Sequence, residues 1–323
     1  MEKKMSTETL EYTFNVEDPA RLRVNNVRGH VDVQPGEDGM ISVSVLIHKN
    51  SGSNGQPKII VVQENDGLVV AEAKYDNSFI NLFGLNKPCK VDFTIKAPKA
   101  CSVHVNCVSS TANISGLEGN FDVQGVSGNI NLEDLSGDFN FNSVSGKVSA
   151  KNLVGAIEIN NVSGKVEINE AQISKLFSKS VSGSTIIETP LTEGPYEFNS
   201  VSGNVSLLTP EDTTCTIYIK SMSGRAKVNL PVTSRSGSKN NEVIEVAGGG
   251  PAVRLKSVSG ILKVGSTNYI NPEEPQPEME VAPSPVSEQI NEPATQPKTQ
   301  MQILQEIENG GISVEEALEL LNP

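Results

Sequence analysis

Tryptophan is absent from this 323-residue chain, and aromatic residues make up only 4 % of it. No run approaches the ~18 consecutive apolar residues of a membrane-spanning helix. Residues 1–10 contain lysines but no apolar stretch behind them, so no secretory signal is predicted. A core of Val, Ile, Leu and Ala with few aromatics is typical of a narrow stack of β-strands rather than of a deep enzyme pocket.

Cysteine is scarce as well, with four irregularly spaced residues. This pattern indicates reduced thiols and therefore favours a cytoplasmic protein. A cytoplasmic protein attached to the periphery of a membrane is the second form of this prediction. The order Cys101, His104, Cys107 suggests zinc at first sight. In a strand, however, Cys101 and Cys107 share one face with Val103 and Val105, and His104 points to the other face. We therefore predict two core cysteines, a surface histidine and no metal site.

Negative charge is concentrated at one end of the chain. The formal net charge is −13, and residues 267–323 hold eleven acidic side chains against one lysine, which accounts for −10. The remaining body is near neutral and has no basic stripe, so nucleic acid is not an expected partner.

Glycine recurs every nine residues between residues 119 and 172. The six phrases are GNFDVQGVS, GNINLEDLS, GDFNFNSVS, GKVSAKNLV, GAIEINNVS and GKVEINEAQ. Positions 3 and 5 of most phrases are apolar, as in Phe139 and Phe141 or Ile157 and Ile159, and residues two apart share one face of a strand. Positions 6 and 7 supply turn residues, and the glycine permits a positive φ at the corner.

A single strand and turn cannot bury its own apolar face, whereas stacked copies can. The phrase Ser-Val-Ser-Gly returns at 180–183, 200–203 and 257–260, with Ser-Met-Ser-Gly at 221–224. We predict coils of about 18–20 residues with two short strands each, that is, an all-β parallel β-helix-like solenoid. Calcium-binding β-rolls carry Gly-Gly-x-Gly-x-Asp, which these turns lack. The Ser234–Asn241 stretch is expected to interrupt the last coils.

The segments before the repeat are predicted strands. Alternating apolar residues mark strands over 10–48, with Gly29, Val31 and Val33 as an imperfect first copy of the repeat phrase. Residues 59–63 and 68–73 flank a turn and predict a hairpin. The apolar stretch Phe79–Leu85 is interpreted as a plug over the solenoid end. Its alternative is an exposed patch for a partner or membrane surface, with Phe79, Ile80, Leu82 and Phe83 as candidate interaction residues.

The amino-acid composition changes twice towards the C-terminal end of the chain. Residues 266–298 are rich in Pro and Glu and predict a disordered linker. Residues 299–323 carry two capping boxes around Asn309-Gly310-Gly311, which predicts two short helices. Helices this short need a docking partner: a copy of themselves, the solenoid or another protein. The candidate interaction residues there are Leu304, Ile307, Leu318 and Leu321.

The predicted domains are therefore a flexible N-terminus over 1–9, a solenoid over 10–265, a linker over 266–298 and a helical segment over 299–323.

The phrases SVSGNV, NVSGKVEI and SVSGILKV, preceded by VDFTIKAPKACSVHV, resemble a bacterial domain family of unknown function labelled "putative adhesin" or "β-strand repeat". The resemblance covers residues 10–265. The tail ILQEIENGGISVEEALELL resembles the SHOCT-like helical segment that accompanies such domains. The resemblance implies oligomerisation or docking through this tail and a context of envelope stress. It implies no catalytic residues.

An enzyme is the main alternative class, because β-helices include carbohydrate-active enzymes. With coils of 18 residues, Asp122, Asn140 and Glu158 fall in one row, and Asn131, Ser149 and Glu167 in another. Asp122 and Glu158 would then be roughly 9–10 Å apart by strand spacing, within the range of an inverting pair. The sequence supplies no further catalytic group beside them.

The glycines at 248–250 lack the Gly-Lys-Ser/Thr of a phosphate-binding loop, and no cofactor is expected. We therefore predict a non-enzymatic scaffold or interaction protein, with a carbohydrate-binding or carbohydrate-active β-helix and a peripheral membrane sensor as alternatives.

Overall fold

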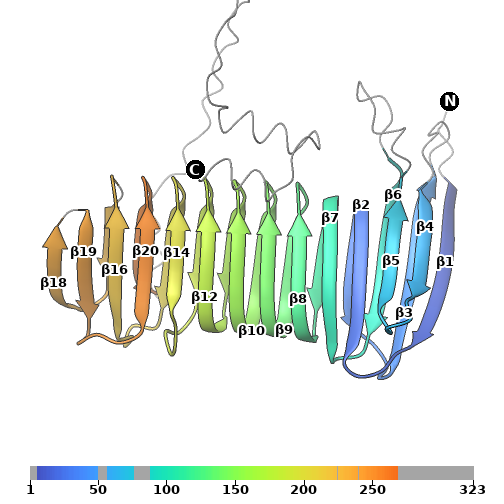
Figure 1. Cartoon of the computed structure of the whole chain (residues 1–323), viewed down its shortest axis with the longest axis horizontal. Coiled ribbons are helices and arrows are strands. Elements are labelled where there is room, and N and C mark those ends of the chain that lie inside the picture. The colour runs from blue at the N-terminus through green and yellow to red at the C-terminus, as the bar shows by residue number, and fades with distance from the viewer. Residues whose placement is uncertain (1–5, 50–56, 76–87, 224, 239, 268–323) are drawn as a thin grey trace, which may run out of the picture. The chain divides into compact units, whose positions relative to one another are not determined.

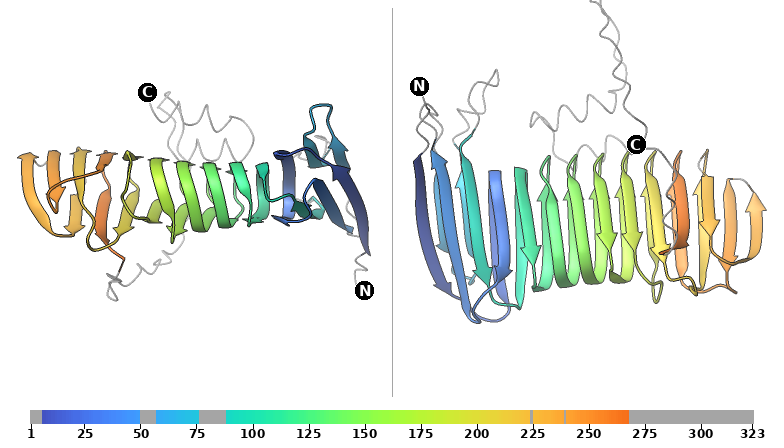
Figure 2. Two further views of the ribbon diagram at one scale, coloured as in Figure 1. Left: turned by 90° about the horizontal axis from the view of Figure 1, so that it is seen from below. Right: turned by 180° about the vertical axis from the view of Figure 1, so that it is seen from behind.

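The computed structural model describes residues 6–49, 57–75, 88–223, 225–238 and 240–267. Within these ranges the chain forms 21 β-strands in one hydrogen-bonded network and no helix. Figures 1 and 2 show the strands side by side along one axis. The predicted all-β solenoid is confirmed.

Each coil of the repeat region adds one strand to each of two facing sheets. The strands are β7 (Cys101–Ser115), β8 (Glu118–Gly125), β9 (Ile130–Ser143), β10 (Lys147–Asn161), β11 (Lys165–Asn169), β12 (Gln172–Ser180), β13 (Ser184–Glu188), β14 (Tyr196–Ser200) and β15 (Asn204–Thr209). The long strands β7, β9 and β10 pass round a corner and serve both sheets. The first sheet contains β8, β12 and β14, and the second contains β11, β13 and β15. Parallel partners 18 to 20 residues apart, such as Ile130 beside Val148 and Ser184 beside Asn204, confirm the predicted coil length.

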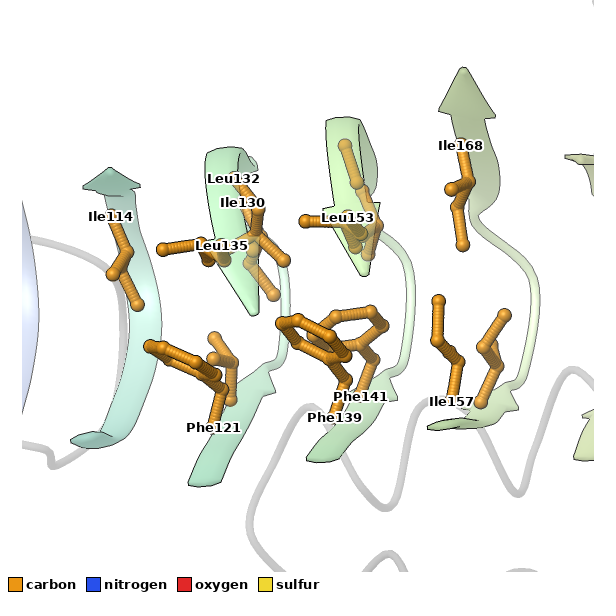
Figure 3. Packing of buried hydrophobic residues seen from close by; sticks show 14 of the residues in the cluster. Ile114, Phe121, Ile130, Leu132, Leu135, Phe139, Phe141, Leu153, Ile157 and Ile168 are labelled. Carbon is orange, nitrogen blue, oxygen red and sulfur yellow. The ribbon is translucent and has the colours of Figure 1, made fainter. Parts of the chain in front are cut away.

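The space between the two sheets is filled by one continuous apolar core. Phe121 and Phe139, neighbours on adjacent strands of the first sheet, stack with ring centroids 5.2 Å apart. Leu135 and Leu153 are fully buried at the corners between the sheets. Figure 3 shows these side chains converging between the two layers of strands. The predicted inward residues, Ile130, Leu132, Phe139, Phe141, Ile157 and Ile159, are all buried.

The Val-Ser-Gly corners require glycine because the backbone of the neighbouring coil is too close for any side chain. A Cβ placed on Gly128, Gly146, Gly164, Gly183, Gly203 or Gly260 would lie 1.7 to 2.8 Å from the carbonyl oxygen of the residue stacked beneath it. These glycines do not have positive φ, so the predicted role of the glycine is wrong at this corner. At the opposite corner it is confirmed, with φ of 137° at Gly137 and 141° at Gly155.

At the N-terminal end the chain order and the spatial order differ. The strands are β1 (Ser6–Asn15), β2 (Ala20–Pro35), β3 (Met40–Lys49), β4 (Lys58–Gln63), β5 (Val69–Lys74) and β6 (Lys90–Ala97). Strand β2 forms the first coil and lies between β7 on one side and β5 and β6 on the other. Strands β3 and β1 then extend the second sheet antiparallel, and the predicted hairpin is present as β4 and β5. Strand β1 begins at Ser6, ahead of the predicted domain start at residue 10.

At the C-terminal end a late coil is inserted between two earlier ones. The strands are β16 (Cys215–Ser221), β17 (Arg225–Asn229), β18 (Val232–Ser238), β19 (Asn241–Val246), β20 (Ala252–Ser257) and β21 (Ile261–Ser266). The coil β20–β21 pairs with β14–β15 on one side and with β16–β17 on the other. Figure 1 shows orange β20 between β14 and β16. The expected stacking in chain order is therefore wrong here, and the predicted polar interruption is the antiparallel hairpin β18–β19 beside β16.

The predicted helical segment 299–323 lies outside the described residues, as do residues 268–298 of the predicted linker.

Gly146→Ala should lower the free energy of unfolding by about 3 kcal/mol, because its Cβ would meet the Gly128 carbonyl oxygen at 1.9 Å. Gly265→Ala is the matched control, since its Cβ would find Asn229 at an ordinary 3.8 Å. Chemical denaturation measures both. Equal and small losses in the two variants would contradict the steric role of the corner glycine.

Candidate functional site

The outer surface of the first sheet carries a row of polar side chains from four neighbouring strands. His104 of β7 lies beside Asp122 of β8, which lies beside Asn140 of β9 and then Glu158 of β10. We call these four residues the His104 row. The predicted alignment of Asp122, Asn140 and Glu158 is confirmed, and likewise that of Asn131, Ser149 and Glu167 on the second sheet.

Hydrogen bonds join three members of the His104 row, His104, Asp122 and Asn140, across the strands. The His104 Nδ1 donates to Asp122 Oδ2 at 2.9 Å, and Asn106 Nδ2 donates to His104 Nε2 at 2.9 Å. Asn140 Nδ2 also donates to Asp122 Oδ1, at 3.4 Å. Both ring nitrogens of His104 therefore have a protein partner, which fixes the orientation of the ring.

A shallow groove of about 1130 Å³ runs along this surface. Its lining includes outward side chains of β2, β7, β8, β9, β10, β12 and β14: Arg21, Arg23, Ser102, His104, Asn120, Asp122, Asp138, Asn140, Ala156, Glu158, Lys175, Phe177 and Glu197. The turn between β4 and β5 borders one end, where Asp66 pairs with Arg21 at 3.2 Å. Towards the other end, Lys179 Nζ lies 5.1 Å from the centroid of the Phe177 ring.

Charges of both signs are mixed along the groove. Glu197 pairs with Arg254 at 3.4 Å, and Asp122 is held by His104. Arg23, Lys175, Asp138 and Glu158 take part in none of the ion pairs found in the described part of the chain. Six carboxylates and three basic side chains line the groove, so negative charge prevails in it, and its polar side chains include both hydrogen-bond donors and hydrogen-bond acceptors.

A second cluster of titratable groups lies on the second sheet near the N-terminal end. Asp92 of β6 accepts hydrogen bonds from His48 Nε2 at 2.6 Å and from His30 Nδ1 at 3.1 Å. Burial raises the pKa of Asp92, but the hydrogen bonds from His48 and His30 outweigh it and hold the pKa below its ordinary value. Across the described ranges, no group of three or more His, Cys, Asp or Glu side chains is arranged to hold a metal ion.

Cys101 and Cys107 lie on the core side of β7, as predicted. Cys101 and Cys107 are buried, whereas His104 projects into the groove. Burial raises the pKa of the Cys101 thiol to about 12 and those of Cys107 and Cys215 to about 11. The zinc interpretation is thus excluded by geometry, because the imidazole and the two thiols face opposite sides of β7.

The two groups of candidate interaction residues predicted from the sequence lie outside the described residues. The first group is Phe79, Ile80, Leu82 and Phe83, and the second is Leu304, Ile307, Leu318 and Leu321. The sequence reasoning missed the contact between His104 and Asp122. The signal that would have found it is the 18-residue spacing itself, which extends back from Asp122 to His104.

Two facing parallel sheets wound from short coils define a repeat protein of the β-solenoid class. The chain belongs to the Toastrack DUF4097 family, whose profile it matches over residues 20–264. No helix in the described part of the chain has the length and apolarity needed to cross a bilayer.

Several solved structures are similar to this chain. One is described as a "putative adhesin" from Bacteroides fragilis, with 12 % identity, a TM-score of 0.44 and coverage of 79 % of this chain and 97 % of that one. A "putative adhesin" from Parabacteroides distasonis has 12 % identity, a TM-score of 0.44 and coverage of 80 % and 97 %. A "putative cell adhesion protein" from Clostridium sporogenes has 14 % identity, a TM-score of 0.25 and coverage of 80 % and 100 %. No curated protein matches the chain.

Asp92→Asn should lower the free energy of unfolding by about 1 kcal/mol at pH 7, because two imidazoles lose a charged acceptor. The folded pKa lies below the ordinary 3.8. The carboxylate therefore stabilises the fold above that value, and the effect is lost as the pH falls through the folded pKa. Denaturation from pH 7 to pH 2 should show the difference from wild type shrinking. The control is Asp32→Asn, a partly exposed carboxylate whose hydrogen-bond partner is Gln34. A pH-independent difference would contradict the assignment.

Cys101, Cys107 and Cys215 should react with N-ethylmaleimide at least roughly a hundredfold more slowly in the native protein than after unfolding, because burial and raised pKa values suppress the thiolate. Peptide mapping by mass spectrometry reads each site separately. Rapid modification of any of the three in the native state would show that its strand is not packed as described.

Proposed function

We propose that this chain is a non-enzymatic interaction protein whose solenoid presents the groove of the first sheet to a partner. The observation that carries this proposal is the bonding of the His104 row. The one imidazole–carboxylate pair in the groove has both ring nitrogens engaged, by Asp122 and Asn106. Side chains that are held by their neighbours form a pre-organised surface for recognition, because little side-chain freedom is lost when a partner binds.

The C-terminal part of the chain supplies the second half of the proposal. Residues 299–323 bring copies of the chain together or dock it on another protein, through Leu304, Ile307, Leu318 and Leu321. The acidic Pro-rich stretch 266–298 acts as a tether. Tethering converts separate weak contacts into one stronger attachment, because the second contact forms at a high effective concentration. Several grooves gathered in this way would bind a repetitive partner.

Buried thiols at Cys101, Cys107 and Cys215 support a reducing location, so we propose that the protein acts in the cytoplasm. Attachment at the periphery of a membrane is the variant of this proposal that depends on residues 79–85.

A carbohydrate-active enzyme is supported less well. Asp122 and Glu158 lie two strands apart, roughly 9–10 Å by strand spacing, as an inverting pair would. Such a pair needs one carboxyl group poised to give a proton. Asp122 instead accepts hydrogen bonds from His104 on one carboxylate oxygen and from Asn140 on the other.

Full-length protein should have a solution mass that is a multiple of 34.5 kDa, and the double variant Leu304→Asp, Leu318→Asp should return it to 34.5 kDa. Charges in place of apolar residues of the predicted helices remove the contact that joins the copies. Val154→Asp, at an exposed valine of β10, is the control and should leave the mass unchanged. Light scattering after size-exclusion chromatography gives the masses. A monomeric wild type would overturn self-association.

A further inference from the structure

The groove of the first sheet has a shape and a chemistry that specify a ligand class. We propose that it binds a neutral linear polysaccharide laid along the solenoid axis, across the strands. This inference rests on the proposed interaction function and names the partner of the same site.

The dimensions of the groove favour a chain-like ligand. The groove is lined by seven neighbouring strands, from β2 to β14. At ~4.8 Å per strand step, its length is about 29 Å. A small metabolite would leave most of this surface exposed to water, whereas an extended polymer contacts every strand in turn. Because each coil presents its outward side chains at the same spacing, a repeating ligand meets repeating contacts.

The outward side chains suit hydroxyl groups. Ser102, Asn120, Asn140 and Glu158 offer hydroxyl, amide and carboxylate groups on consecutive strands. A sugar hydroxyl both donates and accepts, and it is therefore best satisfied by amides and carboxylates side by side. Because Asn140 is already oriented by its hydrogen bond to Asp122 at 3.4 Å, little side-chain freedom is lost when a ligand binds.

An aromatic ring completes the groove. Phe177 lies next to Glu158 on the adjacent strand and is a partly exposed aromatic side chain among polar neighbours. The apolar C–H face of a sugar ring stacks on such a ring, while the sugar hydroxyls remain with the polar row. The exposed side chain of Lys179 lies over this ring. An exposed cation–π contact contributes only about 0.5–1 kcal/mol, so a sugar ring can displace the lysine from the Phe177 ring.

The balance of charge excludes a polyanion. The groove is lined by three basic side chains and by six carboxylates: Glu64, Asp66, Asp122, Asp138, Glu158 and Glu197. A phosphate polymer or an acidic polysaccharide would bring negative charge against these carboxylates. On the outer surface of the second sheet, by contrast, Lys147 and Lys165 both pair with Glu167, at 2.6 and 2.5 Å, so at this position cations outnumber the carboxylate.

The test is affinity gel electrophoresis of the full-length protein with soluble polysaccharides. The neutral linear probes are glucomannan, xylan, laminarin and dextran, and the anionic probes are polygalacturonate and dextran sulfate. At least one neutral probe should retard the wild type. Asn140→Ala with Glu158→Ala should weaken this binding by about tenfold or more, since hydrogen bonds that involve a charged group are lost. Phe177→Ala should weaken it about fivefold.

The matched control is Asn131→Ala with Glu133→Ala, which removes the same residue types from β9 on the outer surface of the second sheet. It should leave retardation unchanged, and melting curves confirm that all variants are folded. No retardation by any neutral probe, retardation by the anionic probes alone, or an equal loss in the control would each overturn the proposal. The solution mass does not depend on these groove residues, so the measurement of mass tests self-association independently of polysaccharide binding.

Discussion

The close approach of backbone to backbone at the Val-Ser-Gly corners is the contact on which this solenoid depends. A Cβ on Gly146 would lie 1.9 Å from the carbonyl oxygen of Gly128, and the same crowding recurs up the column to Gly260. Only glycine permits this spacing, so the corner sets the register of each coil that carries this glycine against its neighbour. A shift of one residue would turn the core side chains outward. The corner thereby fixes both what is buried and what is displayed.

Register converts isolated polar residues into a surface. Asp122, Asn140 and Glu158 are ordinary outward positions taken singly, yet in register they form one row with His104. Hydrogen bonds to Asp122 hold His104 and Asn140 in place without a dedicated loop or pocket. The same geometry explains why the groove is long and shallow: each coil repeats its neighbour, so the surface extends along the axis. Such a surface is suited to recognition of an extended partner.

Much of the candidate site could be predicted once the coil length was known. The inward and outward faces, the position of His104 and the alignment of Asp122 with Glu158 all follow from strand parity and an 18-residue repeat. The bond between His104 and Asp122 follows from the same repeat, but the glycine phrases begin at residue 119, and His104 lies before them. The groove could not be predicted, since its end is bordered by the turn that holds Asp66, which no repeat connects to β2.

The sequence by itself determined local geometry: where strands run, where corners fall and which side chains face the core, because these depend on residue spacing of two within strands and nine between corners. Only the tertiary structure decided which coils are neighbours. Strand β20 inserts between β14 and β16, and β2 lies between β5 and β7. Such pairing is decided by the summed contacts of whole strands far apart in the chain, and a local pattern contains no information about that sum.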